Sequence, residues 1–196
     1  MKYAKTIGAA ILVSGVAFTG PASAGPASAE ALSYTCAGCH GTNGASVGPA
    51  SPSLAGMSAT YIEDSMIAFK EGEREASIMT RIAKGYDEED FAKMGEFFAA
   101  QPRHVAMQSA GGMSKKGAAL YEKHCESCHA DNGTDPEDDA GFLAGQWTPY
   151  LQYSIEDAMD GTRDYGKKMA RALKKIHDKD GDAGFQALLD YFASVK

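Results

Sequence analysis

The chain has 196 residues, four cysteines and a formal net charge of −7 at pH 7. This acidic balance argues against nucleic acid and anionic lipid as partners and favours a basic docking partner, although solubility alone would also explain it. No stretch of the sequence is apolar for long enough to span a membrane.

The first 29 residues are predicted to be a secretory signal peptide. Lys2 and Lys5 form a basic start, residues 8–18 are apolar, and two small-residue cleavage motifs follow. We expect cleavage before Glu30. Because the segment holds two lysines and no acid, its removal changes the formal charge from −7 to −9. The mature chain is expected to be exported to the periplasm.

A short helix at 30–35 is predicted to lead into a Cys-x-x-Cys-His motif formed by Cys36, Cys39 and His40. This motif is the attachment signature of c-type haem. Its two thiols form thioether bonds to the haem vinyl groups, and the adjacent imidazole ligates the iron. The first motif therefore predicts one covalently bound haem c.

A second copy of the motif, Cys125, Cys128 and His129, lies 89 residues further on and uses the remaining cysteines. Leu54-Ala55-Gly56 recurs at the same offset as Leu143-Ala144-Gly145. The duplication predicts two haem domains at 30–106 and 114–196, joined by a linker at 107–113. Domains of this size would be marginally stable on side-chain burial alone, so each half is expected to unfold without its haem.

Zinc and disulfides are the main rivals for the cysteines. A zinc site needs four ligands that converge on one metal, whereas these pairs lie far apart in separate repeats. Disulfides are common in exported proteins but would leave the histidine of each motif unexplained. Two covalently bound haem c groups remain the preferred prediction.

The rest of each half is predicted to be helical, with no strands. A second helix is expected near Thr60, with a Thr60/Glu63 capping box, and its counterpart at Thr148, with Pro149 at the first helical position. Gly72 and Gly161 are predicted stops. The last helices are expected from Asp87 and Asp182, with apolar faces at helical spacing: Phe91, Met94, Phe98, and Phe185, Leu188, Leu189, Phe192.

The repeat also selects the second iron ligands among nine methionines. Met79 lies 39 residues after His40, and Met169 lies 40 residues after His129, whereas the other methionines tested have no methionine counterpart. Histidine and methionine on opposite haem faces raise the haem potential and leave no open coordination site. The predicted chemistry is outer-sphere one-electron transfer, and this is the layout of a small c-type cytochrome. Packing roles for the methionines, and ligation by His177, remain alternatives.

Five further residues are candidates for haem contact, and four of them recur as pairs in the repeat. They would contact the haem propionates, line the pockets or pack in the core; they are Tyr61, Arg74, Trp147, Tyr150 and Arg163.

The segments after the two motif histidines differ. Residues 41–53 carry no charge, and Pro49 is expected to orient His40 through a backbone carbonyl; after His129 the chain is acidic, and Asp138 stands in the matching place. A neutral haem rim favours a lasting interface, and an acidic rim favours brief, salt-sensitive encounters. Haem one is therefore expected to face a permanent partner, and haem two a mobile basic acceptor.

The sequence resembles the dihaem cytochrome subunit of flavocytochrome c sulfide dehydrogenase over nearly all of the mature chain. The runs that carry the resemblance are residues 36–53, 78–86, 143–153 and 181–184, and Gln146-Trp147-Thr148-Pro149-Tyr150 is the most specific stretch. The resemblance implies an all-α fold of two tandem class I cytochrome c-like domains, each wrapped around one haem. It also implies haem attachment by Cys36, Cys39, Cys125 and Cys128, and iron ligation by His40, Met79, His129 and Met169.

The same resemblance implies a heterodimer with a separate FAD-containing subunit that oxidises sulfide. The cytochrome subunit would pass electrons to a soluble basic acceptor such as a cytochrome c and would not itself catalyse sulfide oxidation. No glycine-rich dinucleotide turn occurs in this chain, so FAD is expected only on the partner. The alternatives are a free-standing dihaem cytochrome that feeds a terminal oxidase and a dihaem enzyme such as a peroxidase. Two matching methionines argue against the peroxidase.

Overall fold

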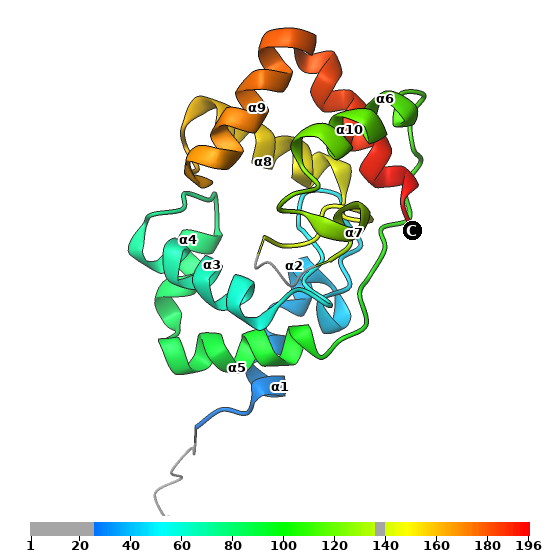
Figure 1. Ribbon diagram of the computed structural model, residues 1–196. Coiled ribbons are helices and arrows are strands. Elements are labelled where there is room, and N and C mark those ends of the chain that lie inside the picture. Colours follow the sequence, from blue (N-terminus) through cyan, green and yellow to red (C-terminus); the bar gives the residue numbers. More distant parts are fainter. Residues whose placement is uncertain (1–25, 136–139) are drawn as a thin grey trace, which may run out of the picture.

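The computed structural model describes residues 26–135 and 140–196 and shows two groups of helices (Figure 1). The first group comprises α1 (Ala29–Tyr34), α2 (Ala37–His40), α3 (Ala59–Glu71), α4 (Met79–Ile82) and α5 (Glu88–Ala99), with 3₁₀ turns at Thr42–Gly44 and Ala83–Gly85. The second comprises α6 (Ser114–His124), α7 (Ala130–Gly133), α8 (Thr148–Asp160), α9 (Gly166–Asp180) and α10 (Asp182–Ser194).

The predicted all-α class is confirmed. Within the described ranges there is no strand, only an isolated antiparallel bridge between Arg74 and Arg163. None of the described helices is long and apolar enough to cross a membrane. Most of the predicted signal peptide and the acidic residues Glu137, Asp138 and Asp139 lie outside the described residues.

Each half has its own apolar core. The first is built around Phe91, Met94 and Phe98 of α5, and the second around Leu188, Leu189 and Phe192 of α10, so the predicted apolar faces of both terminal helices are buried. One residue departs from this division. Phe142 belongs to the second half of the sequence but packs in the first core with 2% of its surface exposed.

Two close helix crossings distinguish the halves. In the first half, a Cβ on Gly95 of α5 would lie 2.7 Å from the carbonyl oxygen of Ala59, so glycine permits α5 to lie against the start of α3. In the second half, Gly117 of α6 lies against the carbonyl of Ala187 on α10. The close glycine contact is therefore made by the α3–α5 pair in the first half and by the α6–α10 pair in the second.

The helix ends follow local sequence signals, with one correction. Gly72 and Gly161 end α3 and α8 in the left-handed conformation, at φ of 80° and 85°, as predicted. The predicted Thr60/Glu63 box is wrong, because Ser58 caps α3 by accepting a hydrogen bond from the backbone N–H of Tyr61.

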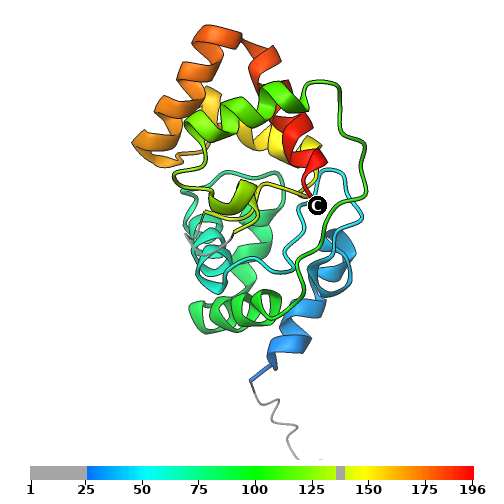
Figure 2. The same ribbon diagram turned by 45° about the vertical axis from the view of Figure 1, so that its right-hand side comes forward.

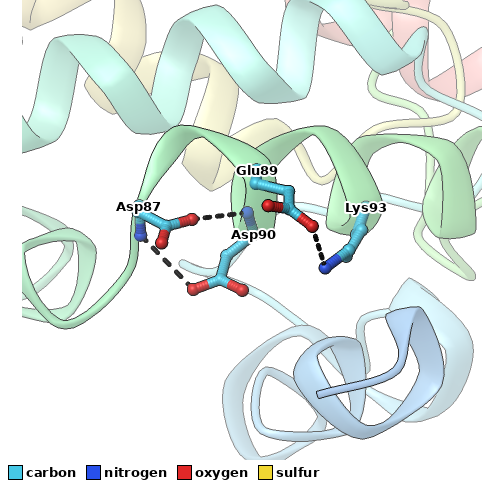
Figure 3. Close-up of polar contacts among 4 residues, drawn as sticks. All are labelled: Asp87, Glu89, Asp90 and Lys93. Atoms are coloured by element: carbon cyan, nitrogen blue, oxygen red, sulfur yellow. Dashed lines mark hydrogen bonds and ion pairs between the residues drawn. The ribbon is translucent and has the colours of Figure 1, made fainter. Parts of the chain in front are cut away.

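The start of α5 shows a complete capping box. Asp87 accepts from the backbone N–H of Asp90 at 3.0 Å, and the Asp90 carboxylate accepts from the Asp87 N–H at 3.3 Å (Figure 3). An ion pair of 2.7 Å between Glu89 and Lys93 lies one turn further along the exposed side (Figure 3). These contacts fix where the terminal helix of the first half begins.

Helix α1 begins upstream of the expected cleavage point. Ser28 caps it through a hydrogen bond of 3.2 Å from the backbone N–H of Ala31. Cleavage before Glu30 would remove this cap. The cleavage site remains a prediction.

The chain between the halves docks along the second half (Figure 2). The Arg103 guanidinium donates to the carbonyl of Ala144 at 2.9 Å, and the backbone N–H of Ala106 donates to Gly145 at 2.7 Å. These bonds hold the end of the first half against the repeated Leu-Ala-Gly turn of the second.

Candidate haem sites and their junction

The first Cys-x-x-Cys-His motif forms one helical turn. The backbone N–H of His40 donates to the Cys36 carbonyl at 2.9 Å, Cys36 packs against the first core, and Cys39 is exposed. His40 is buried, and its Nδ1 lies 2.8 Å from the carbonyl oxygen of Pro52. An Nδ1–H donated to this carbonyl leaves Nε2 as the nitrogen able to bind iron.

The carbonyl that orients His40 is thus that of Pro52, and the expectation for Pro49 is corrected. The two prolines stand in the same uncharged segment, and only the path of the folded loop decides which carbonyl reaches the imidazole. Burial lowers the pKa of His40, which favours the neutral imidazole that a metal requires.

The second motif repeats this local arrangement at the end of α6. The backbone N–H of His129 donates to the Cys125 carbonyl at 2.9 Å, and the His129 side chain is buried. The hydroxyl of Tyr121 donates to the His129 carbonyl and ties the motif to α6. Asp138, the expected counterpart of the orienting proline, lies outside the described residues.

The thiols fit haem attachment better than a zinc or disulfide site. All four cysteines are free, and each pair lies with a buried histidine in its own half. Burial raises the pKa of Cys36, and burial and the neighbouring Cys128 raise that of Cys125 to about 12. The geometry argues against zinc, because no three potential metal ligands converge among the described residues.

The two repeat-matched methionines lie at helix starts. Met79 opens α4 and packs against the first core, and Met169 lies in the first turn of α9; both are half-buried. Met57, Met66 and Met94 are instead buried in the first core. Assignment of Met79 and Met169 as iron ligands remains a prediction.

The other histidines lie elsewhere. His104 Nδ1 contacts the Ser53 hydroxyl at 3.0 Å, and His177 stacks on Phe185 with ring centroids 5.9 Å apart. His177 is exposed and follows Met169 by eight residues on α9, about 12 Å along the helix axis. His177 and Met169 are thus alternatives as ligands to one iron, not joint ligands.

A cluster of repeated residues joins the two halves. Arg74 donates to the Tyr150 hydroxyl at 3.3 Å, and Arg163 donates to the Tyr61 hydroxyl at 3.5 Å, each across the junction. The turn after α3 meets the turn after α8 here, as Figure 1 also shows. A cavity of about 580 Å³ lies at this junction, lined by residues that include Tyr61, Arg74 and Arg163.

The guanidiniums set the electrostatics of this junction. Burial would raise the pKa of Tyr150, but the charges of Arg74 and Arg163 outweigh it and lower the pKa to about 8. Burial, followed by the nearby Tyr150, raises the pKa of Tyr61. Asp64, Glu73 and Asp164 also line the cavity, so its two guanidiniums stand against three carboxylates.

The uncharged segment after His40 is partly covered by the second half of the chain. The side chain of Gln146, fully buried, accepts from the Ser53 N–H at 2.9 Å and donates to the Ser53 carbonyl at 3.0 Å. Trp147 donates through Nε1 to the Ser46 carbonyl at 3.1 Å, and its ring lies directly on Gly48. The low charge of this segment therefore has an intramolecular cause.

Sequence reasoning missed this pairing of Gln146 with Ser53. The available signal was the repeat itself, in which Gln146 stands where the first half has the buried Met57. A polar residue at a core position needs buried hydrogen-bond partners. The side chain of Gln146 finds one in the backbone N–H of Trp147, at 3.1 Å, and two in the backbone of Ser53 in the first half.

Comparison with known proteins places the fold and the family. Residues 23–103 match the family model described as cytochrome c. A reduced recombinant cytochrome c4 from Pseudomonas stutzeri has the same fold, with a TM-score of 0.74 at 23% identity over 86% of this chain and 97% of that one.

Three relatives bear on function. A cytochrome c4 of Pseudomonas aeruginosa is 30% identical over 77% of this chain and 81% of that protein. The thiosulfate dehydrogenase electron acceptor of Stutzerimonas stutzeri is 29% identical over 95% of this chain and 92% of that protein. The cytochrome subunit of sulfide dehydrogenase of Chlorobaculum tepidum is 48% identical, but over only 35% of this chain and 62% of that protein.

The sulfide dehydrogenase likeness has the higher identity but covers only 35% of the chain, not nearly all of the mature chain as predicted. The c4 likeness covers 77% of the chain. The chain belongs to the cytochrome c family and is a c4-like member with a haem-attachment motif in each half.

Proposed function

We propose that this protein is a periplasmic dihaem cytochrome that serves as the electron-transfer subunit of a dehydrogenase that oxidises reduced sulfur, with sulfide as the preferred substrate. The observation that carries the electron-transfer role is the repeated site: in each half a buried motif histidine is matched by a methionine at nearly the same spacing. Filled axial positions leave outer-sphere transfer as the available chemistry.

In this proposal each haem exchanges one electron at a time, and the chain holds and insulates it. Cys36 and Cys39 bind the first haem, with His40 and Met79 as iron ligands. Cys125, Cys128, His129 and Met169 do the same for the second. Arg74 and Arg163 line the junction cavity and are the candidate partners of the haem propionates, in competition with the carboxylates of the same lining.

An apolar surface beside Met79 supports a lasting partner at the first haem. Ile78 and Ile82 flank this methionine and are 47% and 38% exposed. Exposed isoleucines beside a redox centre are typical of the apolar core of an interface. We assign this surface to the FAD-containing subunit, which would take electrons from sulfide and pass them to haem one.

The test is purification of the native complex, followed by visible spectra before and after addition of sulfide and, separately, thiosulfate. A second, flavin-bearing subunit and rapid haem reduction by sulfide are expected. Ile82→Glu should release that subunit, whereas the matched control Met159→Glu, at an exposed apolar position of the second half, should not. Reduction by thiosulfate alone would assign a different dehydrogenase.

A second candidate is a free-standing dihaem carrier that feeds a terminal oxidase. It is favoured by the c4 likeness, which covers more of the chain than the sulfide dehydrogenase likeness. A single dihaem chain that purifies alone, remains oxidised with sulfide and exchanges electrons with membrane oxidase preparations would establish this alternative.

A further inference from the structure

Helix α9 is strongly basic in an otherwise acidic protein. It carries six lysines and arginines against two aspartates, an excess of four positive charges, while the whole chain has a net charge of −7. All six cations are exposed: Lys167, Lys168, Arg171, Lys174, Lys175 and Lys179. They recur at spacings of three and four residues, so they share one face of the helix.

The opposite face of α9 is already used. Leu173 and Ile176 are 4% and 1% exposed and pack toward the second half. The helix therefore has no free apolar face to insert into a membrane, and its exposed face can act only through charge and hydrogen bonds. Only Lys174 of the six forms an ion pair within the described residues, at 2.8 Å to Asp178.

The positive charge extends from α9 onto α6. Burial lowers the pKa of His124, and Lys123, Lys175 and Lys179 lower it further, so these groups lie near one another. We define the basic patch as Lys123 together with Lys167, Lys168, Arg171, Lys175 and Lys179. In Figures 1 and 2, α9 lies at the opposite end of the molecule from α1 and α5.

The basic patch adjoins the second haem site from two directions. Met169, the predicted iron ligand, lies in α9 directly after Lys168, and His124 directly precedes Cys125. A molecule held on this patch would therefore lie beside the proposed site of haem two.

We propose that the basic patch docks an acidic, soluble one-electron acceptor, which takes electrons from haem two. Each encounter oxidises one ferrous haem to ferric and reduces the acceptor by one electron. The inference rests on the proposed electron-transfer function and specifies the chemical class of its electron acceptor. It replaces the basic acceptor expected at haem two from the acidic segment after His129.

Screening explains how an acidic protein can attract an acidic partner. At physiological ionic strength the Debye length is about 8 Å, so a docking partner responds to the charges within that distance and little to the distant acids. Local complementary charge raises association rates by about 10–1000-fold at low salt. The patch would steer the acceptor to one end of the molecule.

The experiment measures oxidation of the reduced dihaem protein by two probes in stopped flow. Oxidised plastocyanin is the acidic probe, and oxidised mitochondrial cytochrome c is the basic one. The charge-reversed variant is Lys168→Glu/Arg171→Glu. The matched control is Arg81→Glu/Lys84→Glu, which makes the same charge change beside Met79 at the first haem.

We expect the α9 variant to slow oxidation by plastocyanin at least about 10-fold at low salt and to flatten its salt dependence. The control should change it less than about twofold. Lys168→Gln/Arg171→Gln, with milder effects on folding, should give an intermediate loss. Visible spectra and haem potentials should be unchanged in all three, because the side chains are exposed.

Equal losses in both reversed variants, or unchanged rates in both, would overturn the proposal. So would binding to phosphatidylglycerol vesicles that depends on Lys168 and Arg171 while the plastocyanin rate does not. The assay uses chemically reduced protein without a dehydrogenase, so failure here leaves the sulfide and thiosulfate experiment to decide the proposed function independently.

Discussion

Met79 and Met169 occupy matching positions in the repeat, but the surface around Met79 is apolar and the surface around Met169 is basic. Met79 opens α4, a single turn with exposed isoleucines and one cation, whereas Met169 lies in the first turn of α9, a helix of 15 residues with six cations. The spacing from histidine to methionine is nearly constant, while the surface around it has diverged. The spacing of the predicted ligands is thus kept between the repeats, and in our proposals the two differing surfaces receive different kinds of partner.

The strongest way to break this comparison is to remove one haem. Cys125→Ser/Cys128→Ser should abolish attachment of the second haem and unfold much of α6–α10, because so small a half lacks a sufficient core without it. Haem content per chain and far-ultraviolet circular dichroism measure the loss. The reciprocal Cys36→Ser/Cys39→Ser should spare the second haem. Loss of both haems in either variant would mean that the halves do not fold separately.

Exchange of the axial ligands tests whether the two methionine sides are equivalent at the iron. Met79→His and Met169→His should each lower the potential of one haem by on the order of 0.1 V or more, since bis-histidine ligation lacks the thioether that raises it. Redox titration followed in the visible spectrum measures this. Met107→Leu, at a methionine that is 91% exposed, is the control and should change neither potential.

The contact between the halves can be weakened without touching either haem. Gln146→Leu removes both partners of the buried Ser53 backbone and should cost about 2–4 kcal/mol of unfolding free energy. Urea unfolding should then separate into two transitions. Gln152→Leu, at an exposed glutamine on α8, should leave one transition at the wild-type urea concentration. An equally large loss of unfolding free energy in Gln152→Leu would refute the role of the junction.

The smallest effect concerns the helix start that differs between the repeats. Ser58 caps α3, whereas α8 follows Trp147 without a side-chain cap. Ser58→Ala should therefore cost about 1 kcal/mol of unfolding free energy, and Thr60→Ala should cost less than about 0.5 kcal/mol. Thermal unfolding of the holoprotein compares them. A larger loss of unfolding free energy in Thr60→Ala than in Ser58→Ala would support the Thr60/Glu63 capping box instead.

Much of the fold could be predicted because its signals are local. Gly72 and Gly161 end helices in a conformation that glycine adopts without steric cost, and the apolar spacing from Phe91 and Phe185 marks the buried faces of α5 and α10. The haem motifs are equally local, since Cys-x-x-Cys-His places its histidine within one helical turn of the first cysteine.

Other features could not be predicted, because they depend on which loops meet. The uncharged segment 41–53 suggested an external partner, yet Gln146 and Trp147 of the same chain cover part of it. Pro52, not Pro49, presents its carbonyl to His40. Loop carbonyls carry no side-chain signature, so sequence pattern does not distinguish one acceptor from its neighbour.

The sequence by itself determined the all-α class, the duplication and the two haem-attachment motifs, because each is written in residue spacing along one chain segment. Only the tertiary structure decided that Arg74 and Arg163 meet Tyr150 and Tyr61 across a shared cavity, and that the cations of α9 remain on the outside. These contacts join residues 76 and 102 positions apart, and their geometry follows from how the two folded halves pack together.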